Sequence, residues 1–125
     1  MHPPPATQLD AQALERLQEM EAEGYFTVRE FVDLFATESA DRLQQLVGAV
    51  EAGDIEAAHR QAHSLKSAGL EVGARAMASL AEQIERLARE QNLAGCAELT
   101  ARLQDAYAST RAELSRLGLL TSTDS

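Results

Sequence analysis

The chain has 125 residues, enough for one domain with a real hydrophobic core. Its net charge of -9 and the lack of a basic stripe exclude an ordinary nucleic-acid-binding surface. Hydrophobic residues make up 45% of the sequence but aromatic residues only 4%, with no Trp, which favours closely packed helices over a sheet.

The N-terminal segment predicts an extended lead followed by a short helix. Three consecutive prolines at positions 3–5 favour an extended, mobile conformation, and we assign residues 1–8 to this lead. Apolar side chains then recur at helical spacing, at Leu9, Ala13, Leu17 and Met20. We therefore expect a first helix from about Asp10 to Glu21, ended by Gly24.

The second helix has a strong start signal. Thr27 is the expected N-cap, and Glu30 completes a capping box three residues later. Phe26 and Phe31 occupy the two positions of a hydrophobic staple. The apolar stripe predicts that this helix extends to about Ala52.

Glycines separate the central elements. Gly53 and Asp54 predict the end of the second helix and the N-cap of a third, which runs to about Val72 and breaks at Gly73. Gly48 lies inside the second helix, where it marks either a close helix crossing or a tolerated weakness.

Two further helices follow, one from Ala74 to about Glu90 and one from the end of a turn at 91–95 to about Leu117. The fourth helix has a strip of small residues that allows a close neighbour: Ala74, Ala78 and Ala81. The fifth helix carries the spacing of a bundle seam: Ala97, Thr100, Leu103, Tyr107, Thr110, Leu114 and Leu117.

The predicted fold is all-α, an antiparallel up-down four-helix bundle with a short additional N-terminal helix, over residues 9–118. Residues 119–125 are expected to form a polar tail.

The third helix carries a distinctive solvent-facing strip. His63 points away from the expected apolar side, with His59 one turn before it. Lys66 and Ser67 follow one turn later, and Leu70 follows two turns later. A neutral imidazole is nucleophilic near pH 7, and a neighbouring ammonium can offset the charge of a bound phosphoryl group.

The sequence His-Ser-Leu-Lys-Ser-Ala-Gly-Leu-Glu-Val-Gly-Ala at residues 63–74 resembles the signature of histidine phosphotransfer (HPt) domains. The family pattern is His-x-x-Lys-Gly, followed by small residues and a Gly-Ala pair about ten residues after the His. His63, Lys66, Gly73 and Ala74 match this pattern. Ser67 replaces the usual Gly, which keeps the side chain small.

This resemblance implies a phosphocarrier rather than an enzyme. His63 would relay a phosphoryl group between aspartates of receiver domains, in response regulators or in a hybrid sensor histidine kinase. Lys66 would stabilise the phosphoryl group, and Glu85 would occupy the position from which family members orient the imidazole. The expected partner-binding residues are His59, Ser67, Leu70 and Arg89. No cofactor is expected on this chain, and Mg²⁺ would belong to the receiver.

His59 and His63 have an i, i+4 spacing that can bind zinc, but two ligands are too few, so no metal site is predicted. The sequence lacks a Gly-x-x-x-x-Gly-Lys-Ser loop, so we do not expect a kinase. The rival function is a helical adaptor that binds a signalling partner without chemistry, or a degenerate phosphotransfer fold used only for docking.

The expected location is the cytoplasm. Cys96 is the single cysteine, which fits a reducing compartment, and the N-terminus does not resemble a signal peptide. No apolar run approaches the ~20 residues of a membrane span, so neither membrane nor nucleic acid is an expected partner. The Met1 start and the polar C-terminal end favour a stand-alone protein.

Overall fold

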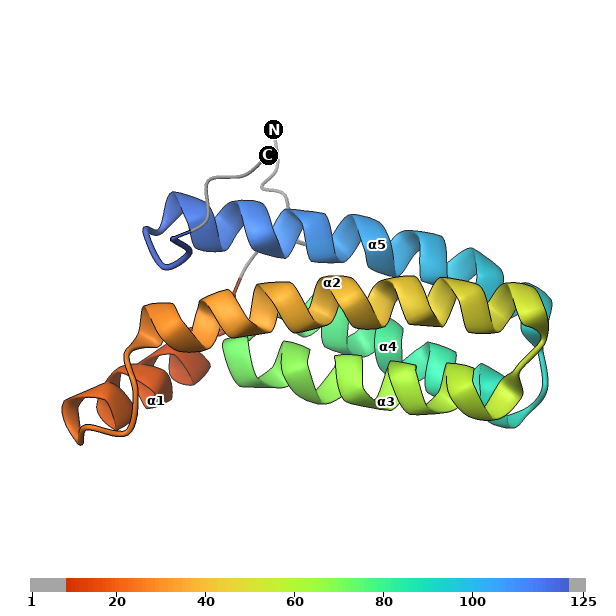
Figure 1. The fold of residues 1–125 in the computed structure, drawn as a ribbon, viewed down its shortest axis with the longest axis horizontal. Coiled ribbons are helices and arrows are strands. Elements are labelled where there is room, and N and C mark those ends of the chain that lie inside the picture. The colour runs from red at the N-terminus through yellow and green to blue at the C-terminus, as the bar shows by residue number, and fades with distance from the viewer. Residues whose placement is uncertain (1–8, 122–125) are drawn as a thin grey trace.

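The computed structural model describes residues 9–121. Within this range the chain forms five helices: α1 (Ala11–Ala22), α2 (Val28–Ala52), α3 (Ile55–Val72), α4 (Arg75–Arg89) and α5 (Leu93–Arg116). Helices α2 to α5 run alternately in opposite directions and pack as a bundle, and α1 lies beneath the start of α2 (Figure 1). The predicted fold class is therefore confirmed. The lead assigned to residues 1–8 lies outside the described residues.

A polar residue precedes each helix except α4 and accepts a hydrogen bond from a free amide of its first turn. At α2, the Glu30 amide donates to Thr27 Oγ1 at 3.0 Å, and the Thr27 amide donates to Glu30 Oε1 at 3.1 Å, which completes the predicted capping box. The rings of Phe26 and Phe31 lie 5.2 Å apart, as expected for a staple. Asp54 caps α3 by accepting from the Ala57 amide at 3.1 Å.

The start of α5 differs from the prediction, which placed residues 91–95 in a turn. Helix α4 ends where Gln91 adopts a positive φ of 61°, and α5 begins at Leu93. The Asn92 side chain accepts from the Gly95 amide at 2.9 Å, so Gly95 lies inside the first turn of the helix. A Cβ at Gly95 would lie 2.9 Å from Leu87 Cδ1, so this glycine permits close packing rather than a turn.

The core is built from the facing stripes of all five helices. Its largest fully buried apolar side chains are Val32, Leu46, Leu65, Val72, Met77, Ile84, Leu103 and Leu114. Two residues of the predicted α5 seam differ: Ala97 is exposed because Cys96 faces the core, and Leu117 is 44% exposed. Of the predicted polar tail, only residues 119–121 are described, and there Leu120 is 5% exposed and packs in the core.

Small residues bring α3 and α4 together. A Cβ at Gly69 would lie 3.2 Å from both Ala74 O and the Ala78 amide nitrogen, so the small strip of α4 does lie against a neighbouring helix. Gly48 differs, because a Cβ there would meet nothing within 4 Å. It therefore marks no close helix crossing.

Candidate functional site

His63 lies in the middle of α3, on the side that faces solvent. Its neighbours Ala62 and Leu65 are fully buried and fix the orientation of the helix. The imidazole itself is 58% exposed, and its Nδ1 lies 2.8 Å from Glu85 Oε2 on α4. The ring is therefore held at one nitrogen and open to solvent at the other.

Glu85 is a buried carboxylate, with its side chain only 8% exposed. It lies between Ala81 and Ala88, which are fully buried on the same face of α4, so the close packing of α4 on α3 carries it beneath the histidine. Lys66 Nζ lies 3.1 Å from Glu85 Oε1. Glu85 Oε2 lies 3.5 Å from His59 Nε2 and 3.9 Å from an Arg89 Nη atom. One carboxylate is thus shared by four basic side chains.

The ionisation of Glu85 decides which nitrogen of a neutral His63 ring carries the proton. Burial by itself raises the pKa of the Glu85 carboxyl, but hydrogen bonds from His63 and Lys66 and their charges outweigh burial and hold the pKa below its ordinary value. An ionised carboxylate can only accept hydrogen bonds. In the neutral ring of His63 the proton therefore lies on Nδ1, and Nε2 keeps a free lone pair.

The structure brings four of the predicted site residues together around Glu85. Lys66 was expected to stand beside His63 as a cation available to a phosphoryl group, but it is engaged with Glu85 Oε1. His59 was expected only as a docking residue, yet its Nε2 lies 3.4 Å from an Arg89 Nη atom and it joins the same cluster. Helix spacing indicated none of these contacts, because each depends on the register between α3 and α4.

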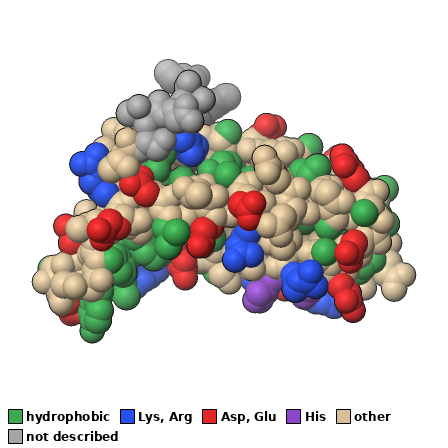
Figure 2. Space-filling model, viewed as in Figure 1, with side chains coloured by type: hydrophobic (Ala, Val, Ile, Leu, Met, Phe, Trp, Pro, Cys, Tyr) green, Lys and Arg blue, Asp and Glu red, His purple; other side chains and the backbone are tan. Residues whose placement is uncertain are grey.

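The two remaining predicted residues lie on the same exposed strip but outside the Glu85 cluster. Ser67 is exposed, and Leu70 is 55% exposed. Leu70 lines an apolar pocket of about 350 Å³ together with α1 and the Phe26–Phe31 pair. Figure 2 shows hydrophobic side chains gathered over α1 and the start of α2, with the histidines farther along the same edge of the molecule. Sequence analysis identified Leu70 but not this groove.

Sequence analysis also missed a polar chain between α2 and α3. Arg42 donates from Nη1 to Gln61 Oε1 at 3.3 Å, and Gln61 donates to Gln45 Oε1 at 2.9 Å. Gln45 in turn donates to Asp41 Oδ2 at 2.7 Å. In the sequence, Arg42 and Gln45 are ordinary polar residues of the second helix. Their spacing among apolar residues did not indicate that their side chains contact α3.

Within residues 9–121, no group of three or more His, Cys, Asp or Glu side chains could hold a metal ion. Lys66 and Arg89 lie against the same carboxylate as the two histidines, so cations already occupy the place a metal would take. Over the same residues, no helix is both long and apolar enough to cross a membrane.

Comparisons with known proteins identify relatives of this chain. A family model described as Hpt domain matches residues 30–113. Among solved structures, the chain is similar to histidine-containing phosphotransfer protein B (HptB) from Pseudomonas aeruginosa PAO1, with a TM-score of 0.78 and 28% sequence identity. That match covers 89% of this chain and 95% of HptB. A search of the curated proteins finds no match.

Proposed function

Since this chain belongs to the Hpt domain family and is a histidine phosphotransfer protein of phosphorelay signalling, we propose that His63 is the residue that carries the phosphoryl group. The observation that supports this assignment is the pairing of an exposed Nε2 with an Nδ1 that is tied to the buried carboxylate of Glu85. A surface histidine without such a partner would populate both tautomers and many orientations.

The proposed step is a direct transfer between two residues. Nε2 of His63 attacks the phosphorus of an aspartyl phosphate in a receiver domain, and a new P–N bond forms as the P–O bond to the aspartate breaks. The aspartate carboxylate leaves with the electron pair. The proton stays on Nδ1, where Glu85 stabilises the positive charge that develops on the ring. The reverse step returns the phosphoryl group to an aspartate of another receiver.

Lys66 and Arg89 are proposed to stabilise the phosphorylated form. A phosphoryl group brings about 1.5 to 2 negative charges, by analogy with other phosphorylated side chains. It then competes with Glu85 for the Lys66 ammonium and the Arg89 guanidinium, both of which already lie within 4 Å of that carboxylate. We infer that these cations are shared between the two anions after transfer. His59 would keep the arginine close to the ring.

The proposed partner surface combines polar and apolar contacts. Receiver domains would approach over Ser67, which leaves the imidazole accessible, and would contact Leu70 and the apolar groove beside it. Such receivers belong to response regulators or to a hybrid sensor kinase, and Mg²⁺ would be held by the receiver. We place the protein in the cytoplasm, without nucleic-acid or membrane partners and without kinase activity, and the free, buried thiol of Cys96 fits a reducing compartment.

The test is transfer of labelled phosphate from phosphorylated receiver domains encoded in the same genome. Wild-type protein and His63→Gln are compared with His59→Gln, which alters a histidine one turn away in the same cluster. We expect label on the wild type and on His59→Gln, and none on His63→Gln. Equal labelling of His63→Gln would refute the assignment. A receiver that binds without transferring label to the wild type would support the adaptor function instead.

A further inference from the structure

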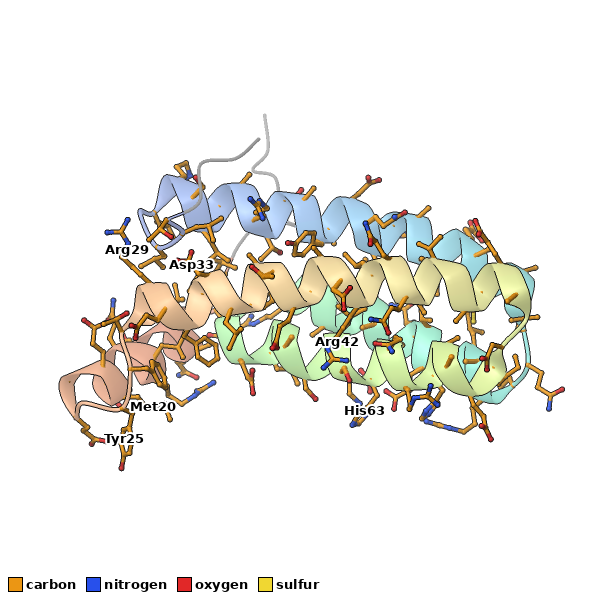
Figure 3. All side chains as sticks on the ribbon, viewed as in Figure 1. Met20, Tyr25, Arg29, Asp33, Arg42 and His63 are labelled. Carbon is orange, nitrogen blue, oxygen red and sulfur yellow. The ribbon has the colours of Figure 1, made fainter. Side chains whose placement is uncertain are left out.

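A pocket of about 390 Å³ opens directly beside His63. Most of its lining comes from α3, including His63, Ser64 and Gln61, and Glu85 contributes from α4. The one lining residue from α2 is Arg42. Figure 3 shows the Arg42 side chain extending from α2 toward the imidazole of His63. The histidine is thus flanked by a carboxylate on α4 and by a guanidinium on α2.

The position of Arg42 is fixed by the polar chain described above. Gln61 is 9% exposed, and its amide group donates to Gln45, which leaves Gln61 Oε1 as the acceptor for Arg42 Nη1. Gln45 donates to the carboxylate of Asp41. All three hydrogen bonds run in one direction, from the guanidinium to the carboxylate, so each strengthens the next. Reversing the Gln61 amide would place its NH₂ group against the guanidinium, and two donors cannot form a hydrogen bond with each other.

Arg42 differs electrostatically from the cations on the other side of the ring. Lys66 and Arg89 share the single negative charge of Glu85, so each of them would divide its contacts between that carboxylate and a phosphoryl group. Arg42 bonds to a neutral amide and forms no ion pair with a carboxylate anywhere in residues 9–121. Its charge is therefore available to a new anion in the pocket, and a guanidinium can bind two phosphoryl oxygens at once.

We propose that Arg42 is a phosphoryl-binding residue, which contacts the group carried by His63 from the α2 side of the pocket. In the imidazole ring Nε2 lies across from Nδ1, and Nδ1 faces α4, so a phosphoryl group on Nε2 extends away from Glu85. His63 and Arg42 line the same pocket, so a phosphoryl group that occupies it from the side of the ring opposite Nδ1 can contact the guanidinium. The inference rests on the proposed role of His63.

The experiment uses a chemical donor and no receiver. Phosphoramidate transfers its phosphoryl group to Nε2: the new P–N bond to the ring forms as the donor's P–N bond breaks, and ammonia leaves. The ³¹P resonance of the phosphohistidine is then followed against pH, which gives the second pKa of the phosphoryl group. The variants are Arg42→Gln, Arg42→Lys and Gln61→Leu. Arg102→Gln, an exposed arginine on α5, is the control with the same loss of charge.

A neighbouring guanidinium favours the dianion, so its removal raises the phosphoryl pKa. We expect a rise of about half a unit in Arg42→Gln, a smaller rise in Arg42→Lys and Gln61→Leu, and no change in Arg102→Gln. Equal values in Arg42→Gln and Arg102→Gln would overturn the inference while leaving His63 as phosphoacceptor. Failure of the donor to modify His63 would overturn the inference together with its premise. Labelling by phosphoramidate without exchange with any receiver would count against the relay function alone.

Discussion

Gly69 is the residue whose substitution most directly tests the packing that supports the site. In Gly69→Ala the new Cβ would lie 3.2 Å from Ala74 O and 3.2 Å from the Ala78 amide nitrogen. Both are backbone atoms of the α3–α4 corner, so neither can turn aside as a flexible side chain would. Relieving such a contact requires α4 to shift, at a cost of about 1–3 kcal/mol.

The intrinsic preference of Ala for helices works in the opposite direction. Replacing Gly by Ala inside a helix contributes about 0.5–1 kcal/mol. Gly48→Ala isolates this contribution, because its Cβ meets nothing within 4 Å and Gly48 also lies inside a helix. We therefore expect Gly48→Ala to stabilise the protein by about 0.5–1 kcal/mol, and Gly69→Ala to be less stable than Gly48→Ala by about 1–3 kcal/mol.

The assay is urea denaturation followed by far-UV circular dichroism, with the free energy of unfolding obtained by linear extrapolation. Comparing the two variants cancels the helix preference and leaves the cost of the contact. If Gly69→Ala proved as stable as Gly48→Ala, the close approach of α3 and α4 would be wrong. The same shift of α4 would lengthen the contact between His63 and Glu85, so phosphotransfer is expected to slow in Gly69→Ala but not in Gly48→Ala.

Two further substitutions test the site itself. In Glu85→Gln a neutral amide, which can donate as well as accept, replaces the carboxylate, so the proton of neutral His63 is held less strongly on Nδ1, as ¹⁵N chemical shifts would show. Transfer is expected to slow about tenfold, the equivalent of one charged hydrogen bond of ~1.5 kcal/mol. The pKa of Glu85 is lowered in the folded state, so its ionised form stabilises the wild type relative to Glu85→Gln. This extra stability is expected in full above pH 4.5, the ordinary pKa of the carboxyl, and is lost as the pH falls through the folded-state pKa. A stability difference between the two proteins that grew toward acid pH would contradict this. Leu70→Asp is expected to reduce transfer from a receiver about tenfold while changing stability by less than about 0.5 kcal/mol. Leu117→Asp, at an exposed leucine directly after α5, is expected to leave transfer unchanged. Unaltered transfer in Leu70→Asp would remove the apolar groove from the docking surface.

The sequence was sufficient to predict the helices because their ends carry local chemical signals. Thr27 with Glu30, and Gly53 with Asp54, act on neighbouring backbone groups, and the structure has the helix ends there. Gly95 was misread because its reason lies elsewhere, in the Leu87 side chain of another helix. A glycine in a closely packed helix and a glycine in a turn look the same in one sequence.

The site was predictable along α3 but not across helices. His63 and Lys66 share one helix, so their spacing was enough to put them on one face. Glu85 was proposed on family resemblance, since its place depends on how α4 is rotated against α3. Arg42 was missed because it lies far from His63 in the sequence. Packing between α2 and α3 brings it to the pocket beside His63. No local pattern in the sequence encodes that packing.

The attachment of α1 has a consequence for how the molecule opens. This helix has 12 residues, a length that is marginal in isolation, and it buries only Ala13 and Leu17. Two backbone amides tie its ends to the rest: Asp10 donates to Gly73 O at 2.8 Å, and Val28 donates to Glu21 Oε1 at 2.8 Å. Its amide hydrogens should therefore exchange with solvent through a local detachment that leaves the other four helices folded. Because α1 forms one wall of the groove at Leu70, any molecule seated there would slow that exchange.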